Sequence, residues 1–248
     1  MKKHIPNILT LGNLLCGTIA TIASVNGNFE IAALAVIVGI ILDFFDGFVA
    51  RMLNVSGELG KQLDSLADMV TSGVVPGIIM FSLLQENSLN FFEKTTGTFD
   101  TASFTTGYLP HVGLILTLAA CYRLANFNID NRQSDFFIGM PTPAMSLFVI
   151  ALPLIPIYSD NQFFVDLVQS NTFLIGITIL LSFLMNAEIP LFSLKFKNYR
   201  FKENVLKYVF LMASIGMIFT LEVISIPLII ILYVLISLGS NLSKKKAN

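Results

Sequence analysis

The chain has 248 residues, of which 54% are hydrophobic and only 12% are charged. Soluble domains carry about twice this charged fraction, so the composition excludes an ordinary water-soluble globular protein. The net charge of −1 is uninformative in itself, and no nucleic-acid partner is expected.

Eight stretches with little or no charge have the roughly 17–25 residues that a helix needs to cross the hydrocarbon core of a bilayer. In chain order they lie near residues 8–25, 30–50, 69–85, 108–128, 142–158, 171–187, 204–221 and 223–241. No linker or repeat divides them, so the sequence predicts a single all-α domain over residues 1–248, a polytopic bundle of about eight transmembrane helices. The first stretch follows a basic start, as in a signal peptide, but Asn7, Thr10 and Asn13 make it too polar for one.

The basic residues lie almost entirely in alternate connections between these stretches. If both termini are cytoplasmic, Lys94 is the only one of the 15 on the outer side. The other fourteen are Lys2, Lys3, Arg51, Lys61, Arg123, Arg132, Lys195, Lys197, Arg200, Lys202, Lys207, Lys244, Lys245 and Lys246. This asymmetry predicts an even number of spans with both termini in the cytoplasm. We expect an integral protein of a bacterial cytoplasmic (inner) membrane.

Four carboxylates interrupt the apolar pattern at the end of the second stretch and the start of the third. Asp43 and Asp46 are spaced i, i+3, and Asp64 and Asp68 are spaced i, i+4, so each pair shares one helix face. The connection at about residues 52–59 is short, which predicts that the two helices are antiparallel neighbours. Their carboxylates should then converge near the cytoplasmic end of the bundle.

Such a cluster needs shared protons or cations, because four ionised carboxylates repel one another. Hard ions such as Mg²⁺ or Mn²⁺ suit a site made only of oxygen ligands. Two of these ions can clamp the attacking and leaving oxygens of a phosphoryl displacement. The carboxylates alone fit a divalent-cation transporter equally well.

Small residues and a fixed positive charge lie beside the acids. Gly47, Ala50 and Gly60 leave room for a bulky ligand, although small residues also serve close helix packing. Arg51 suits a phosphate, with an internal ion pair as the alternative. These neighbours favour phosphate chemistry over transport.

Residues 43–68 read D-x2-D-G-x2-A-R-x8-G-x3-D-x3-D. This pattern resembles in full the signature of the CDP-alcohol phosphotransferase family. The resemblance implies an integral membrane enzyme, usually dimeric, whose active site faces the cytoplasm.

The resemblance also assigns roles to the eight fixed positions of the signature. It implies that two divalent ions, bound by four aspartates, hold the CDP pyrophosphate, with the last aspartate as the proposed general base. In this chain the metal ligands would be Asp43, Asp46, Asp64 and Asp68, and Asp68 would be the base. The nucleotide and its phosphates would lie against Gly47, Ala50, Arg51 and Gly60.

Three further segments resemble the bacterial phosphatidylserine synthases within this family. They are P-N-I-L-T-L-G-N-L-L-C-G at residues 6–17, R-L-A-N-F-N at 123–128 and F-I-G-M-P-T-P-A at 137–144. The related phosphatidylglycerophosphate synthases usually carry Arg at the place of Asn13. Asn126 departs from the pattern, because many of the serine enzymes have a basic residue there.

The resemblance implies transfer of a phosphatidyl group from CDP-diacylglycerol to L-serine, which gives phosphatidylserine and CMP. The same chemistry with glycerol 3-phosphate, inositol phosphate or choline as the acceptor stays open, and so does the transporter. A guanidinium group suits the carboxylate of serine. The candidate acceptor-binding residues are Arg123, Asn126, Asn128, Arg132, Asn7 and Asn13, with Arg123 preferred.

Overall fold

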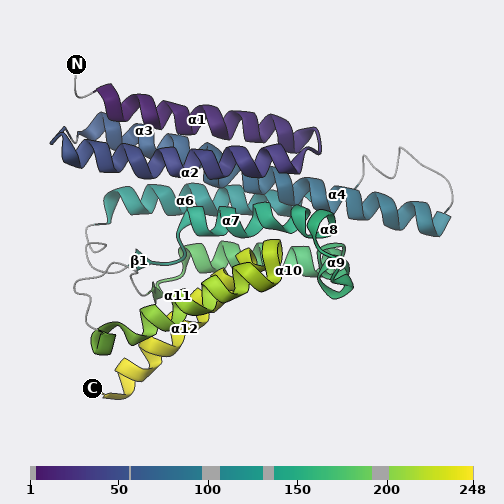
Figure 1. Ribbon diagram of the computed structural model, residues 1–248. Helices are drawn as coiled ribbons and strands as arrows, with labels where there is room; N and C mark the ends of the chain where they lie inside the picture. The colour runs from purple at the N-terminus through teal and green to yellow at the C-terminus, as the bar shows by residue number, and fades with distance from the viewer. Residues whose placement is uncertain (1–3, 56, 97–106, 131–136, 192–200, 248) are drawn as a thin grey trace.

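The computed structural model describes residues 4–55, 57–96, 107–130, 137–191 and 201–247, and nearly all of them are helical (Figure 1). The long helices run side by side in one bundle, and α1 begins at the end of the bundle where α12 ends. The elements are α1 (His4–Val25), α2 (Phe29–Met52), α3 (Glu58–Asp68), the π-helical η1 (Met69–Val74), α4 (Val75–Thr96), η2 (Leu109–Leu114), α6 (Ile115–Ile129), β1 (Phe137–Ile138), α7 (Thr142–Ala151), η3 (Leu152–Leu154), α8 (Ile155–Tyr158), α9 (Gln162–Val168), α10 (Asn171–Asn186), β2 (Pro190–Leu191), α11 (Phe201–Leu221), η4 (Glu222–Ile224) and α12 (Ser225–Ala247).

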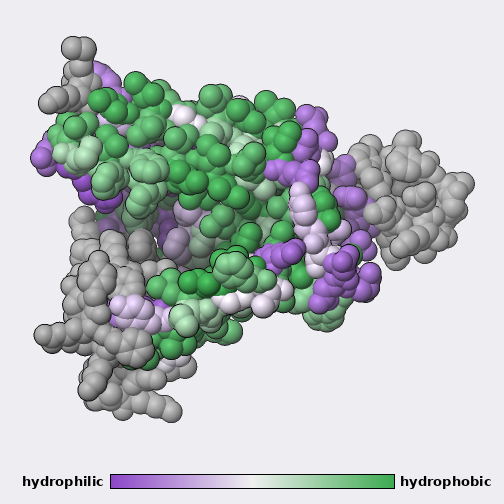
Figure 2. Space-filling model, in the orientation of Figure 1, coloured by the Kyte–Doolittle hydropathy of each residue, from purple (hydrophilic) through white to green (hydrophobic). Residues whose placement is uncertain are grey.

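Helix α1 distributes its residues in the opposite way to a helix in a soluble protein. Its buried face carries small and polar residues, namely Pro6, Thr10, Asn13, Gly17, Ala20, Ala23 and Ser24. Its exposed face carries large apolar residues, among them Ile8, Leu11, Leu15 and Ile22. Small residues allow helices to approach closely, and large apolar ones suit a lipid solvent. Figure 2 shows the same apolar covering over much of the bundle.

Five helices are long and apolar enough to cross a membrane, or up to six if a bent pair is counted as one span. Four of the five correspond to the first four predicted stretches: His4–Val25, Phe29–Met52, Glu58–Ser88 and Leu109–Ile129. The third is longer than expected, because the helix that carries Asp64 and Asp68 continues without interruption into the apolar stretch. The predicted helical membrane bundle is therefore confirmed as an architecture.

The remaining predicted stretches are less regular. Residues 142–158 form a shorter apolar helix, and residues 171–187 belong to a pair of helices, α9 and α10, bent by 73°. The last two stretches form one apolar run, Asn204–Gly239, within which η4 separates α11 from α12. These two helices contact each other, and Glu222 between them has a positive φ of 46° (Figure 1).

A π-helical turn, η1, follows Asp68 directly. Its geometry leaves carbonyl groups without their usual helical partners. Hydroxyl groups from two other helices take these places: Thr117 donates to the carbonyl of Gly73 at 3.0 Å, and Ser146 donates to that of Thr71 at 3.5 Å. The turn is thus fixed against α6 and α7, at the point where the carboxylate-bearing helix enters the core.

The only strands among the described residues are β1 and β2, which pair antiparallel with Phe137 opposite Leu191 and Ile138 opposite Pro190. Gly139 follows β1 with a φ of 73°. A Cβ atom there would lie 2.4 Å from the carbonyl oxygen of Met185, so both the backbone angle and the close approach require glycine. This turn brings the start of α7 onto the end of α10.

Candidate active site

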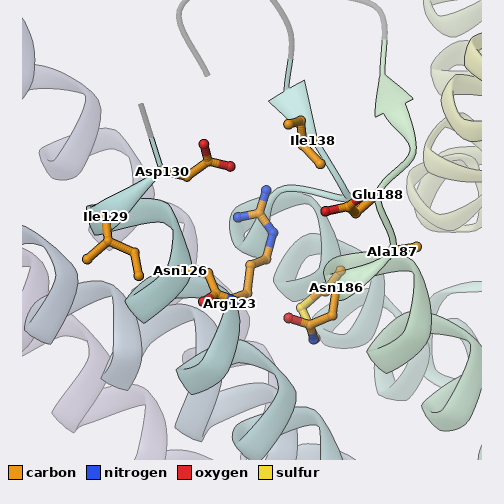
Figure 3. A pocket seen from close by; sticks show the side chains of 9 residues that line it. Arg123, Asn126, Ile129, Asp130, Ile138, Asn186, Ala187 and Glu188 are labelled. Carbon is orange, nitrogen blue, oxygen red and sulfur yellow. The ribbon is translucent and has the colours of Figure 1, made fainter. Parts of the chain in front are cut away.

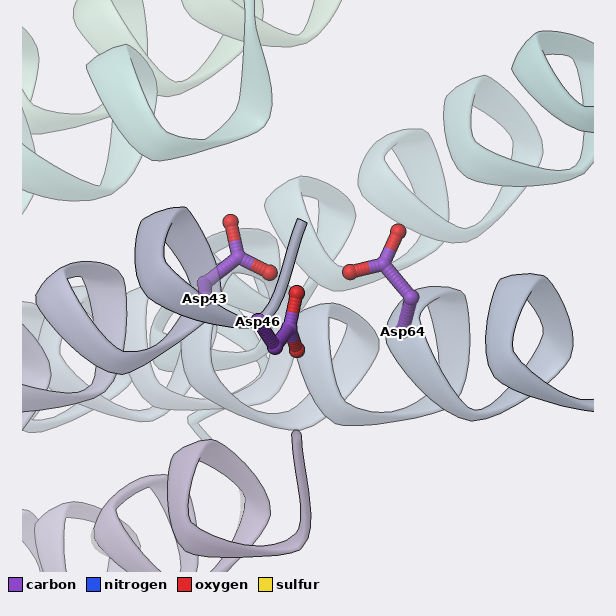
Figure 4. A group of neighbouring side chains, drawn as sticks. All are labelled: Asp43, Asp46 and Asp64. Atoms are coloured by element: carbon purple, nitrogen blue, oxygen red, sulfur yellow. The ribbon is translucent and has the colours of Figure 1, made fainter. Parts of the chain in front are cut away.

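Three of the four predicted carboxylates converge between α2 and α3 (Figure 4). Asp43, Asp46 and Asp64 each offer an oxygen atom, and these atoms lie within 4.8 Å of one another. Asp46 is 5% exposed, and the other two are half-buried. The short connection predicts two antiparallel neighbours, but α2 and α3 pack chiefly against α1 and contact each other little, so packing on α1 is what brings their acids together.

Asp68 lies one turn beyond Asp64 on α3, and its side chain contacts that of Asp43. Among the described residues, the buried Oδ1 atom of Asp43 has no hydrogen-bond partner. A buried, unpartnered carboxylate oxygen is costly unless a cation completes it. The cluster contains only carboxylates, as a site for Mg²⁺ or Mn²⁺ requires, so the donors fit a divalent ion.

A cavity of about 390 Å³ adjoins the carboxylates. Its wall includes Asp43, Asp46, Asp64, Gly47, Ala50, Arg51, Gly60, Lys61, Asn7 and Thr10. A Cβ atom at Gly47 would meet nothing within 4 Å, so this glycine leaves open space and is not a close helix contact. All four predicted nucleotide-site residues therefore line one cavity together with three of the acids.

Helix α1 contributes polar side chains to the same region, spaced i, i+3, i+6. Asn7 lines the cavity, and the Thr10 hydroxyl donates a hydrogen bond to Oδ2 of Asp46. Nδ2 of Asn13 donates to Oδ1 of Asp68 over 3.2 Å. Asn13 itself is fully buried and does not line the cavity.

Arg123 lies in a second cavity, of about 400 Å³, between the ends of α6 and α10 (Figure 3). The side chain is 7% exposed, and Figure 3 shows its guanidinium group pointing into the cavity, between Asp130 and Glu188. Asn126 and Asn186 also line this cavity. The two cavities share no lining residue.

One contact with the backbone holds the guanidinium. An Nη atom of Arg123 donates to the carbonyl oxygen of Gly139 at 3.4 Å, while its buried Nε has no partner among the described residues. The positive-φ turn at Gly139 places that carbonyl over α6. The segment F-I-G-M-P thus shapes the wall of the Arg123 cavity.

The other candidate acceptor residues are distributed differently. Asn128 lines neither cavity: its amide donates to Ser65 Oγ at 2.8 Å, and its carbonyl oxygen accepts a hydrogen bond from Lys61. Arg132 lies outside the described residues. Of the six candidates, the structure therefore brings Arg123 and Asn126 together and puts Asn7 beside the acids.

Sequence reasoning did not single out Thr10, Lys61, Asp130 or Glu188, which all line one of the two cavities. Thr10 lies midway between Asn7 and Asn13, and this stripe of polar residues in an apolar helix was a detectable signal. The sequence also contained a signal for Lys61, because this residue precedes Asp64 by three positions and so shares its helix face. The sequence contained no signal for Asp130 and Glu188, since they come to line one cavity only through the packing of α6 on α10.

Residues 3–185 match the CDP-alcohol phosphatidyltransferase family. This match spans well over half of the chain, and the residues of the family signature meet at one cavity. The chain belongs to this family.

Several curated proteins are similar to the chain along much of its length. A CDP-diacylglycerol–serine O-phosphatidyltransferase of Bacillus subtilis (strain 168) is 36% identical over 154 residues, which cover 60% of this chain and 75% of the relative. The enzyme of the same name from Helicobacter pylori (strain J99) is 30% identical over 225 residues, or 89% and 84%. An archaetidylserine synthase of Methanothermobacter thermautotrophicus is 25% identical over 160 residues, or 63% and 60%.

Proposed function

We propose that the chain transfers a phosphatidyl group from CDP-diacylglycerol to L-serine and releases CMP. The observation that carries the proposal is the convergence of Asp43, Asp46 and Asp64 beside a cavity lined by the other signature residues. The choice of serine is supported by the printed names of the relatives from Bacillus and Helicobacter.

The donor would bind with its pyrophosphate against the carboxylate cluster. We propose that two Mg²⁺ or Mn²⁺ ions are held by Asp43, Asp46, Asp64 and Asp68. Bound there, such ions neutralise charge on the pyrophosphate and on the departing CMP. Arg51 and Lys61 line the same cavity and add positive charge that suits phosphate oxygens.

Asp68 is proposed as the general base. It accepts the proton of the serine hydroxyl while the serine oxygen forms a bond to the phosphorus that bears diacylglycerol. The bond from that phosphorus to the CMP oxygen breaks. A base within hydrogen-bond reach contributes about 10²–10⁴ in rate.

The Arg123 cavity has the charges that a zwitterionic amino acid needs. A guanidinium group can hold a carboxylate through two parallel hydrogen bonds. Asp130 and Glu188 line the same cavity and offer negative charge toward an ammonium group. We therefore place the serine carboxylate on Arg123, with Asn126 beside it.

The proposal extends to the arrangement of the chain in the membrane. Eight crossings, with both termini and the carboxylate cluster on the cytoplasmic side of a bacterial inner membrane, account for the distribution of basic residues. The start of α1 and the end of α12 at one end of the bundle support an even number of crossings (Figure 1). A homodimer is proposed from the family resemblance.

The test is a product assay on the purified protein in lipid vesicles. The donor is CDP-diacylglycerol, and the acceptors are L-serine, glycerol 3-phosphate, inositol phosphate and choline, each with Mg²⁺, Mn²⁺ or a chelator. We expect CMP and phosphatidylserine, identified by mass, only with serine and only when a metal is present.

Each other outcome has a distinct meaning. A product from another acceptor would retain the chemistry and replace serine. Full activity in the presence of a chelator would exclude the proposed metal requirement. If no acceptor released CMP, a divalent-cation transporter would be the better account of the carboxylates.

A further inference from the structure

Asn13 is a polar side chain of α1 that reaches the carboxylates from inside the bundle. It is 0% exposed and lines neither cavity. Its Nδ2 atom donates to Oδ1 of Asp68 at 3.2 Å. Asp68 lines neither cavity either, and the hydrogen bond to it is the contact through which Asn13 can act on the reaction.

Contacts from two other elements hold the Asn13 backbone and confine its side chain. The Thr71 hydroxyl, on the π-helical turn, donates to the backbone carbonyl of Asn13 at 3.1 Å. On α2, a Cβ atom added to Gly39 would lie 2.8 Å from Oδ1 of Asn13 and 2.9 Å from Cγ2 of Thr71. The amide therefore lies in a slot that three elements form, and the slot depends on a missing side chain at Gly39.

The contact also selects what Asp68 can do. The amide donates to one carboxylate oxygen of Asp68 and so fixes the direction in which the second oxygen points. An amide carries no charge and does not titrate, so it can orient the carboxylate without competing for a proton or a cation. A hydrogen bond to a charged group in a buried site is among the stronger ones.

We propose that Asn13 is a positioning residue, which holds the Asp68 carboxylate in the orientation in which it accepts the proton of the attacking hydroxyl. This inference rests on the proposed role of Asp68 as the base. It predicts a larger effect on kcat than on either KM, because Asn13 lines neither substrate cavity.

The experiment is a double-mutant cycle on the full chain in lipid vesicles, with Asn13→Leu, Asp68→Asn and the combination. Asn13→Leu keeps the branched outline of the side chain and removes the donor. We expect kcat to fall roughly 10- to 150-fold, with the KM for CDP-diacylglycerol and for serine each within about twofold. In the Asp68→Asn background, Asn13→Leu should cause no further loss, because the group it positions is gone.

Two further variants keep the test decisive. Asn13→Ala removes the donor without adding volume or charge, so it should lose kcat in the same way if the Leu variant fails to insert. Ser24→Ala is the matched control: Ser24 is also fully buried on α1, but its hydroxyl bonds to the carbonyl of Ala20. This control should leave kcat unchanged.

The outcomes separate the inference from the proposal on which it rests. If Asp68→Asn keeps full kcat, Asp68 is not the base and both fall. If Asp68→Asn loses activity while both Asn13 variants keep it, only the positioning role falls. An equal loss from Asn13→Leu in both backgrounds, or a rise in the serine KM with kcat unchanged, also overturns the positioning role.

Discussion

Arg123 carries a permanent charge within a bundle whose interior is otherwise mostly apolar. A buried guanidinium is costly unless it has partners or a ligand. One carbonyl contact at 3.4 Å and an Nε atom without a partner among the described residues leave its donors far from satisfied. This shortfall is what a bound carboxylate would complete.

We therefore expect Arg123→Ala to raise the KM for serine roughly 10- to 150-fold, the value of a hydrogen bond to a charged group. The KM for CDP-diacylglycerol should change little, because the donor cavity shares no residue with this one. Arg123→Lys should restore only part of the loss, since an ammonium group cannot make the paired contact. Steady-state kinetics with each substrate varied in turn measures this.

Arg51→Ala is the matched control, because this arginine lines the cavity beside the acids. It should raise the KM for CDP-diacylglycerol and leave that for serine nearly unchanged. If the Arg123→Ala enzyme folds and keeps its serine KM within about twofold, the residue only closes the gap between α6 and the turn at Gly139. Asn7 beside the acids would then be the next candidate.

For single residues, the sequence predicts that the aspartates lie together, but it does not predict which residues hold Asp68 and Arg123 in place. Helical spacing and a short connection predict that Asp43, Asp46 and Asp64 meet, although in the structure the packing of both helices on α1 places them. The partners of Asp68 and Arg123 depend on contacts across 55 and 16 residues. Such contacts are decided by how helices pack, and a single sequence contains no direct signal for that.

Among the elements, α3 has the most demanding position, because it presents Asp64 and Asp68 to a site that α2 completes. It is attached to α6 through one residue. Asn128 donates its amide to Ser65 and accepts a hydrogen bond from Lys61 at its carbonyl oxygen. These bonds link the helix of the carboxylates to the helix of Arg123, and therefore the two proposed substrate cavities to each other.

We expect Asn128→Ala and Ser65→Ala each to lower the free energy of unfolding by about 0.5–1.5 kcal/mol, the net value of one hydrogen bond. The double variant should cost less than the sum, because both changes remove the same bond. Thermal denaturation in detergent, with the four proteins compared under one condition, measures the coupling.

Serine kinetics on the same variants distinguish two roles for Asn128. If it only attaches α3, both single variants should alter the serine KM equally and by a small factor. If Asn128 also contacts the acceptor, its own variant should raise that KM well above the Ser65 variant. The second result would return Asn128 to the acceptor site.

The elements also show where reasoning from hydropathy stops. The stretch near 69–85 is one part of a helix that begins at Glu58, because the polar turns that carry the acids are helical too. Residues 142–158 make a short helix with Pro153 and Pro156 within it, and proline removes backbone donors there. Hydropathy predicts which segments prefer a lipid environment, but it predicts neither where helices bend nor where they begin and end.

On the scale of the whole molecule, the surface carries many large apolar side chains, and the interior combines apolar side chains with small and polar ones. In water this surface would drive aggregation, whereas in a bilayer it faces lipid tails that are equally apolar. The carboxylate cluster lies in the second halves of α2 and α3, so the proposed donor site lies toward one end of the bundle. Which face of the membrane this end meets is decided by the charges of the connecting segments.

The last prediction concerns that orientation. In a protein whose Cys16 and Cys121 are replaced, single cysteines at residue 4, within 195–202 and at the C-terminus should react with an impermeant reagent only from the cytoplasmic face. Cysteines within 88–104 should react only from outside, because Lys94 is the one basic residue that the predicted topology puts there. Labelling of each site after permeabilisation provides the control for intrinsic reactivity. Reaction of the two termini from opposite faces would mean an odd number of crossings. In that case the basic clusters would not be reporting topology, and the cytoplasmic location of the carboxylates would lose its support.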